Sequence, residues 1–167
     1  REYCSMASFA TLCYVFRGSK VLLLLKSKGL FGEGKWNAPG GKLVGTEAPE
    51  AAAAREVYEE TGLKVRELSF HGALNFYLGK CRKLDQTVFV FSSRLARGKL
   101  RQSLEGRLEW FAKDQVPYDQ MWEDDRVWLP LVFAGKRFVG DFYFSDGYVK
   151  LEEYALEEIA NQDSGKK

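Results

Sequence analysis

The sequence has little of what disulfide-rich, zinc-binding and membrane-spanning proteins require. Its three cysteines, Cys4, Cys13 and Cys81, are odd in number and widely spaced, which predicts neither a disulfide framework nor a zinc site. Its longest apolar run, residues 21–25, is far too short to cross a bilayer, and its first residues carry no secretory signal. We therefore expect reduced cysteines, a cytoplasmic location and no membrane partner.

The chain also lacks an excess of either charge. Its 25 Lys and Arg residues nearly balance its 23 Asp and Glu residues, so the charge does not indicate a nucleic-acid polymer as a partner. Apolar residues make up 46% and charged residues 29% of the chain, which is typical of a soluble globular protein. These values predict a single domain over residues 1–167, with flexible ends at 1–7 and 161–167, that acts as a monomer.

Short apolar runs, separated by Gly, Asp and Ser, predict a protein rich in strands. We expect strands at 9–16, 20–25, 65–79, 86–95, 108–112, 137–144 and 148–156, and helices at 48–61 and 125–135. Residues 26–42 hold five glycines and one proline and should form a long loop with a short strand at its end. Strands around one or two helices predict an α/β or α+β fold with a mixed sheet.

Turn and cap residues mark two of these boundaries. Pro49 suits the first turn of the first helix, and Gly62 suits its C-cap. The Asp-Gly pair at 146–147 predicts a hairpin between the last two strands.

Three glutamates crowd one face of the helix expected at 48–61. Glu56, Glu59 and Glu60 stand at i, i+3 and i+4, within an arc of roughly 100°. Like charges at these spacings cost about 0.2–0.5 kcal/mol per pair, and the last turn of a helix disfavours anions. A hard divalent cation such as Mg²⁺ or Mn²⁺, which prefers oxygen ligands, would offset this cost.

The spacing around these glutamates has a recognisable pattern. Gly41, Glu47, Arg55-Glu56, Val57, Glu59-Glu60 and Gly62-Leu63 fit G-x5-E-x7-R-E-U-x-E-E-x-G-U at every position, with U aliphatic. This pattern resembles the signature of the Nudix hydrolases. The resemblance implies an α/β/α sandwich with a mixed sheet and a loop–helix–loop motif. It also implies hydrolysis of a nucleoside diphosphate linked to a further group, with Mg²⁺ or Mn²⁺ as cofactor.

The resemblance assigns roles to the residues of this segment and of one later loop. It implies a metal held by glutamate carboxylates and by a close backbone approach, at Glu56, Glu59, Glu60, Glu105 and Gly41. Arg55 would pair with Glu47 and orient it, and Glu56, Glu60 or Glu105 would accept a proton from the attacking water. A solvated acidic helix face is the alternative for the glutamates, and a Nudix fold without catalysis is the alternative for the function.

Four other stretches resemble a subgroup of this family. FATLCYVF (9–16), FGEGKWNAPGGK (31–42), VPYDQMWEDDRVWLP (116–130) and FVGDFYF (138–144) are similar to MutT-type enzymes that act on oxidised purine nucleoside triphosphates. This similarity implies a small-molecule nucleotide substrate such as 8-oxo-dGTP, cut to the monophosphate and pyrophosphate. The alternatives are a dinucleoside polyphosphate, a nucleotide sugar or an unmodified dNTP as substrate, and a non-catalytic domain that binds nucleotide or RNA.

The same resemblance implies a pocket for the purine base. An amide and two acids would read the hydrogen-bonding edge of the base, an indole would stack on it, and other side chains would line the pocket and flank its mouth. The amide and the acids are Asn37, Asp124 and Asp125, and the indole is Trp122. The lining side chains are Thr11, Phe31 and Phe76, and Lys26 flanks the mouth. Two adjacent carboxyls can share one proton, so that one donates while the other accepts, which suits oxidised guanine and oxidised adenine alike.

Each pocket residue has a structural alternative. Trp122 and Phe76 could belong to the core, Asp124 and Asp125 could open the helix at 125, and Asn37 could be a turn residue. Gly106 replaces a larger apolar residue of the animal enzymes, which predicts a more open pocket wall.

Overall fold

The strands pair into one large mixed sheet and one small sheet. The computed structural model describes residues 6–160. The end expected to be flexible at 161–167, and residues 1–5 of the one expected at 1–7, lie outside the described residues. The strands are β1 (Ser8–Arg17), β2 (Lys20–Lys26), β3 (Trp36–Asn37), β4 (Gly40–Lys42), β5 (Lys64–Arg66), β6 (Ser69–Leu78), β7 (Lys83–Ser93), β8 (Leu95–Arg97), β9 (Gly106–Ala112), β10 (Arg137–Phe144) and β11 (Leu151–Ile159), and the helices are α1 (Pro49–Thr61) and α2 (Asp125–Phe133).

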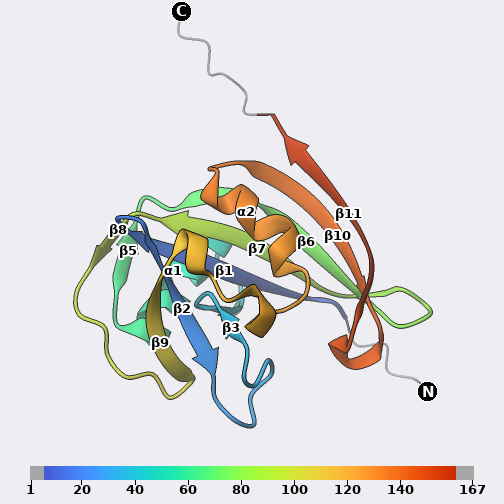
Figure 1. Cartoon of the computed structure of the whole chain (residues 1–167), viewed down its shortest axis with the longest axis horizontal. Helices are drawn as coiled ribbons and strands as arrows, with labels where there is room; N and C mark the ends of the chain where they lie inside the picture. The colour runs from blue at the N-terminus through green and yellow to red at the C-terminus, as the bar shows by residue number, and fades with distance from the viewer. Residues whose placement is uncertain (1–5, 161–167) are drawn as a thin grey trace, which may run out of the picture.

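The large sheet runs in the order β11-β10-β6-β7-β1-β2-β3, as Figure 1 shows, with β4 paired to β1 and β9 paired to β2. β1 is parallel to β7 and β10 is parallel to β6, while the other neighbours in this sheet are antiparallel. β5 and β8 form the separate two-stranded sheet. The predicted α/β class with a mixed sheet is therefore confirmed.

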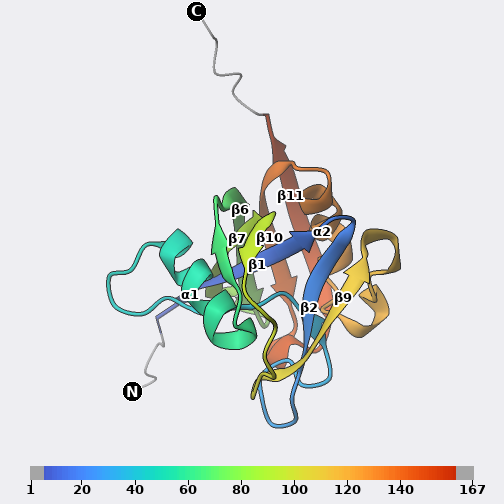
Figure 2. The ribbon, with the colours of Figure 1, turned by 90° about the vertical axis from the view of Figure 1, so that its left-hand side faces the viewer.

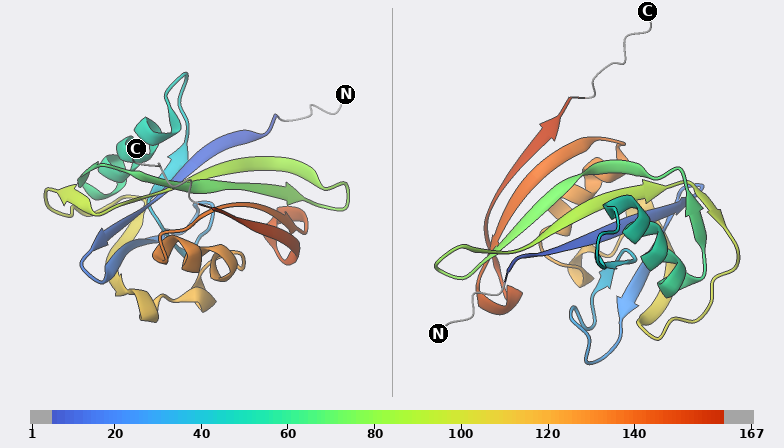
Figure 3. Two further views of the ribbon diagram at one scale, coloured as in Figure 1. Left: turned by 90° about the horizontal axis from the view of Figure 1, so that it is seen from above. Right: turned by 180° about the vertical axis from the view of Figure 1, so that it is seen from behind.

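The two helices cover opposite faces of the large sheet (Figures 2 and 3). Along β1, alternate residues face opposite layers: Tyr14 joins the cluster around Trp128 of α2, whereas Cys13 joins the cluster around Val57 of α1. This period of two is what a strand buried on both faces requires. Three layers result, helix on sheet on helix. Within residues 6–160, no helix has the length and apolar character needed to cross a membrane.

Local signals set the ends of α1 as expected. Pro49 is its first residue, and Gly62 caps its C-terminus in the left-handed conformation (φ 80°), with its N–H donating to the carbonyl oxygen of Tyr58 at 2.9 Å. Alanines Ala52 and Ala53 are fully buried against the sheet, so the helix packs closely on β1.

Two strand expectations were wrong in detail, and a predicted hairpin has a longer turn than its Asp-Gly pair indicates. The strand expected at 65–79 is broken into β5 and β6, because Glu67 adopts a positive φ of 50° that turns the chain. The strand expected at 86–95 begins earlier and is likewise divided, into β7 and β8. The hairpin expected at the Asp-Gly pair is confirmed, because β10 and β11 pair antiparallel. Its turn runs over 145–150, where Gly147 and Tyr148 both have positive φ and Ser145 N–H donates to Lys150 O at 2.9 Å, so β11 begins at Leu151.

Candidate functional site

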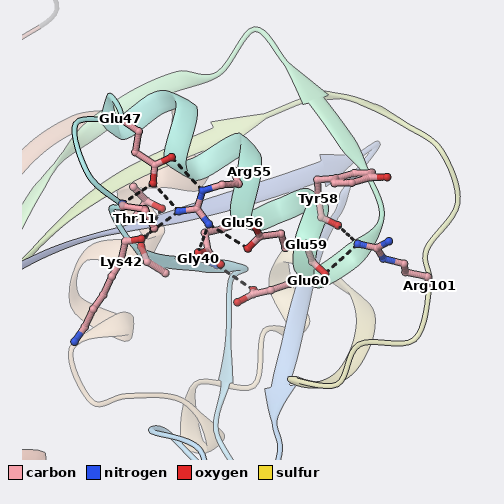
Figure 4. A network of polar contacts seen from close by, with 12 residues as sticks. Thr11, Gly40, Lys42, Glu47, Arg55, Glu56, Tyr58, Glu59, Glu60 and Arg101 are labelled. Atoms are coloured by element: carbon pink, nitrogen blue, oxygen red, sulfur yellow. Dashed lines mark hydrogen bonds and ion pairs between the residues drawn. The ribbon is translucent and has the colours of Figure 1, made fainter.

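Arg55 lies at the centre of a polar network between α1 and the preceding loop (Figure 4). Its guanidinium group binds both carboxylate oxygens of Glu47, with Nε–Oε2 and Nη2–Oε1 distances of 3.1 and 2.6 Å. Its Nη1 also donates to Glu56 at 2.7 Å and to Glu59 at 3.1 Å. The hydrogen bonds from Arg55 are the main reason that the pKa of Glu47 lies below its usual range. One arginine thus orients three carboxylates and offsets one of their three negative charges.

Two glycines let β4 approach α1 closely. The N–H of Gly40 donates to Glu60 Oε2 at 3.1 Å. A Cβ atom on Gly41 would lie 2.6 Å from the carboxyl carbon of Glu56, and a Cβ atom on Gly40 would lie 2.0 Å from the carbonyl oxygen of Thr11. A larger residue at position 41 would meet the Glu56 carboxylate, and one at position 40 would meet the backbone of β1, which gives a physical reason for glycine at both positions.

Glu60 is a buried acid among other acids. Its exposed fraction is 6%, and its pKa is raised to about 7, chiefly by burial. The charges of Glu56 and Glu105 raise the pKa further, while Lys26 and the Gly40 N–H lower it. Lys26 also approaches Glu105, with an Nζ–Oε2 distance of 3.6 Å.

These oxygen donors suit a hard divalent cation. Within residues 6–160, no group of three or more His, Cys, Asp or Glu side chains is already arranged as a metal site, and Arg55 holds two of the α1 carboxylates. The carboxylates that could hold a cation nevertheless lie close together, because the charges of Glu56 and Glu105 raise the pKa of Glu60. Carboxylates without nitrogen or sulfur donors favour Mg²⁺ or Mn²⁺ over zinc.

Arg101 supports the same helical turn and was not identified from the sequence. The last turn of α1 contains no basic residue, yet it carries Glu59 and Glu60. Arg101, which follows β8, donates from Nη2 to the carbonyl oxygens of Tyr58 at 2.7 Å and Glu59 at 3.2 Å, and from its backbone N–H to Thr61 O at 3.0 Å. It supplies the positive charge that a helix C-terminus favours. Because Arg101 lies 42 positions after Glu59, the sequence carries no local signal of this contact.

A cavity of about 370 Å³ lies beside this cluster. All eight residues assigned to the base pocket line it, together with two residues assigned to the metal site. These are Thr11, Lys26, Phe31, Asn37, Phe76, Trp122, Asp124 and Asp125, and Gly41 and Glu105. The base pocket therefore shares one cavity with two of the five residues assigned to the metal site, over separations of up to 94 positions in the chain, whereas Glu56, Glu59 and Glu60 do not line it.

Asp124 and Asp125 are buried at the wall of this cavity, with exposed fractions of 3% and 2%. Asp124 Oδ2 accepts a hydrogen bond from Trp128 Nε1 at 2.7 Å, whereas Asp125 Oδ2 has no partner among residues 6–160. Burial raises the pKa of both carboxyls, and the charge of Asp124 raises that of Asp125 further. Although the two acids stand at the start of α2, the Asp124 side chain makes no capping hydrogen bond, so capping alone does not explain them.

Trp122 offers an aromatic face at the other wall. The ring of Phe31 stacks on it, with centroids 5.2 Å apart and planes at 28°. Lys35 Nζ lies 5.2 Å from the centroid of the indole. Phe31 is 64% exposed, so this ring can move without disturbing the core.

Three residues combine a structural and a cavity position. Phe76 lines the cavity and also stacks on Phe142 in the core, with centroids 5.8 Å apart. Asn37 Oδ1 accepts from the N–H of Ala38 at 2.8 Å, which leaves its amide NH₂ group available to a ligand. Thr11 Oγ1 donates to Gly41 O at 3.5 Å.

The predicted open wall at Gly106 is wrong, because Gly106 does not line the cavity. A Cβ atom there would lie 1.8 Å from the carbonyl oxygen of Leu25, so glycine is needed where β9 meets β2. Eleven of the residues that line the cavity were not identified from the sequence, among them the polar side chains of Lys35, Gln86 and Tyr148.

Known proteins resemble nearly the whole chain. A family model described as the NUDIX domain matches residues 6–132. The oxidized purine nucleoside triphosphate hydrolase of Danio rerio is 41% identical over 150 residues, which cover 89% of this chain and 94% of the relative. The protein of the same name from Mus musculus is 38% identical over 156 residues, with coverages of 93% and 97%. The crystal structure of a MutT protein from Bacillus halodurans superposes with a TM-score of 0.81 at 30% identity, covering 90% of this chain and 97% of that one.

Proposed function

Since the chain belongs to the NUDIX domain family, we propose that it is a pyrophosphohydrolase of oxidised purine (deoxy)nucleoside triphosphates. It would cut a substrate such as 8-oxo-dGTP to the monophosphate and pyrophosphate, and so remove damaged precursors of nucleic acid synthesis. The two relatives named as oxidized purine nucleoside triphosphate hydrolases, at 41% and 38% identity, support this proposal.

One observation carries it: a single cavity is lined both by Trp122 and the two aspartates and by Gly41 and Glu105. A purine held at Trp122 would therefore place its phosphates toward β4 and the carboxylates of α1. The exposed ring of Phe31 is the part of the aromatic stack that the purine would replace.

The chain's own residues would divide the chemistry as follows. Glu56, Glu59, Glu60 and Glu105, with the backbone at Gly41, would hold a divalent cation, Mg²⁺ or alternatively Mn²⁺. When bound, the cation neutralises phosphate oxygens and makes a bound water more acidic. Glu56, Glu60 or Glu105 would accept the proton of that water, while Arg55 keeps Glu47 and Glu56 in position.

The base pocket would supply donors and acceptors together. The amide NH₂ of Asn37 donates, and the Asp124–Asp125 pair shares a proton so that one acid donates while the other accepts. Burial of both acids keeps that proton bound to higher pH than in water. This pairing would admit oxidised guanine and oxidised adenine.

We further propose that the protein works as a monomeric single domain in the cytoplasm. Cys13 and Cys81 are free thiols in the structure, which supports a reducing compartment.

A substrate panel tests the function directly. With Mg²⁺, we expect 8-oxo-dGTP and 2-hydroxy-dATP to be cut to monophosphate and pyrophosphate much faster than dGTP or diadenosine polyphosphates. Equal turnover of dGTP and 8-oxo-dGTP would refute the sanitising role and leave a hydrolase of another nucleotide. No turnover of any compound would leave a non-catalytic binding domain.

A further inference from the structure

Tyr148 closes one wall of the cavity in an unusual backbone conformation. It lies in the turn between β10 and β11 and lines the cavity. Its φ is 59°, in the left-handed region that bulky residues rarely adopt. Strain of this kind persists only where surrounding contacts impose it, and it gathers at functional sites. A second contact fixes this turn to the base pocket, because the N–H of Leu151 donates to Glu123 Oε1 at 3.3 Å, next to Trp122.

The ring of Tyr148 supports the aromatic stack from the side. It meets Trp122 edge-on, with centroids 5.7 Å apart and planes at 67°, and it meets Phe31 with centroids 5.5 Å apart and planes at 71°. Its other side packs on Phe144, with centroids 5.4 Å apart. Tyr148 therefore fixes the plane in which Trp122 is available for stacking.

The hydroxyl group of Tyr148 donates one hydrogen bond and accepts another. It donates to Asp85 Oδ2 at 2.5 Å and accepts from Gln86 Nε2 at 3.2 Å. Burial and the neighbouring Asp85 raise the pKa of Tyr148, so the phenol keeps its proton at neutral pH. Gln86 lines the cavity. Since its NH₂ group is bound to Tyr148, its carbonyl oxygen is the atom left to accept a hydrogen bond from a ligand.

The position of Gln86 defines which edge of a base it could meet. Gln86 is on β7 and Asn37 is on β3, and β1 and β2 lie between these strands in the sheet. Ala10 and Leu12 of β1 line the cavity floor. A purine lying over this floor would present opposite edges to Asn37 and to Gln86.

We propose that Tyr148 is a specificity-determining residue that fixes the amide of Gln86, so that the Gln86 carbonyl oxygen accepts the N7–H of an 8-oxopurine. This inference rests on the proposed function. Oxidation at C8 converts N7 of a purine from an acceptor into an N–H donor. An acceptor at this edge therefore favours the oxidised base, and it meets the lone pair of N7 in an unmodified purine or in 2-hydroxyadenine.

The test compares Tyr148→Phe and Gln86→Leu with the wild-type chain. Tyr148→Phe keeps the ring and removes only the hydroxyl group. We expect an about fivefold rise in KM for 8-oxo-dGTP, the effect of one neutral hydrogen bond, with kcat within about twofold. The KM values for 2-hydroxy-dATP and dGTP should stay within about twofold, because these bases have no N7–H. The double variant should lose no more than either single variant, since the two side chains act as one unit.

The matched control is Tyr154→Phe, on the neighbouring strand β11. Tyr154 is 52% exposed, stacks on Phe142 and does not line the cavity, so its hydroxyl group should not affect any substrate. Titration with 8-oxo-dGMP in EDTA, followed by tryptophan fluorescence, gives a second readout that needs neither metal nor turnover. The same fivefold loss of affinity is expected for Tyr148→Phe.

The outcomes separate this inference from the proposed function. If the wild type binds 8-oxo-dGMP and Tyr148→Phe binds it equally well, the inference is overturned whether or not the chain is a hydrolase. An equal loss for all purines would also overturn it, because Tyr148 would then be supporting the pocket without reading N7. If the wild type cuts no oxidised purine but the 8-oxo-dGMP titration shows the expected loss, the proposed function fails and the inference about Tyr148 stands.

Discussion

Replacing Asp124 with asparagine tests whether the buried carboxyl group of Asp124 lowers the stability of the folded protein. Asp124 is 3% exposed, and its Oδ2 accepts a hydrogen bond from Trp128 Nε1 at 2.7 Å. Asparagine has nearly the same shape, and its amide oxygen can accept the same hydrogen bond. The substitution therefore removes little besides the ionisable group.

The magnitude follows from the pKa. The pKa of Asp124 is raised from 3.8 to about 6, chiefly by burial, and each unit corresponds to about 1.4 kcal/mol. Between about pH 4 and 6 the native state keeps this proton while the unfolded chain has released it. The wild type therefore loses about 3 kcal/mol of unfolding free energy as the pH rises through this window, and no more above it. Asp124→Asn has no such loss, and it also removes the charge that raises the pKa of Asp125. The variant should therefore be the more stable protein at pH 8 and close to the wild type at pH 4.

Thermal unfolding followed by circular dichroism measures this difference. For a chain of this length, about 3 kcal/mol corresponds to a Tm rise of about 6–12 °C at pH 8. The control is Asp119→Asn, because the Asp119 side chain is 94% exposed and pairs with Arg126 at the surface. A variant that is less stable at pH 8, or that differs from wild type equally at pH 4 and pH 8, would refute the reasoning.

The Asp124→Asn variant should also shift purine preference more than it slows turnover.

Two further predictions concern the end of α1. Glu60→Gln should lower turnover about 100-fold or more, whether Glu60 is the base or a metal ligand. The Tm of this variant should stay at or above the wild-type value, because the Gln side chain can still accept a hydrogen bond from Gly40 N–H. An active variant would show that Glu60 is not part of the site. Arg101→Ala should lower the unfolding free energy by about 1 kcal/mol and weaken Mn²⁺ binding measured by calorimetry, beside the exposed control Arg97→Ala. A loss of stability with unchanged Mn²⁺ affinity would make Arg101 a helix cap and no more.

The parts of the fold that could be predicted are those with local causes. Pro49 and Gly62 set the ends of α1 through the backbone conformations that they favour. The break at Glu67 could not be predicted, because a positive φ at a glutamate is imposed by tertiary packing and not by its own preference. The Asp-Gly pair at 146–147 marks the hairpin between β10 and β11 correctly. The conformation of Tyr148 in that turn could not be predicted, since Tyr148 is held by Asp85 and Gln86, more than 60 residues away.

The residues of the candidate site likewise divide into those that a sequence motif predicts and those that only tertiary contacts bring together. The residues from Gly41 to Glu60 form a continuous segment with fixed spacing, so their proximity could be predicted from the sequence alone. Trp122 and the two aspartates were assigned from the resemblance of a separate stretch. Arg101, Gln86 and Tyr148 belong to no motif, and only tertiary contacts bring them to α1 or to the cavity.

The carboxylate cluster of α1 and the cavity beside it both store free energy that a substrate complex would release. On one side, Glu60 is buried among acids at a helix end that disfavours anions. On the other, Asp125 Oδ2 is buried without a partner among residues 6–160, and Tyr148 holds a left-handed backbone. Natural sequences break local rules mainly where function requires it. A cation would relieve the first cost and a purine the second, so metal and nucleotide should stabilise the fold separately, each by its own binding free energy. The protein is thus least stable when it is free of both, which is the expected state of a site organised for its ligands.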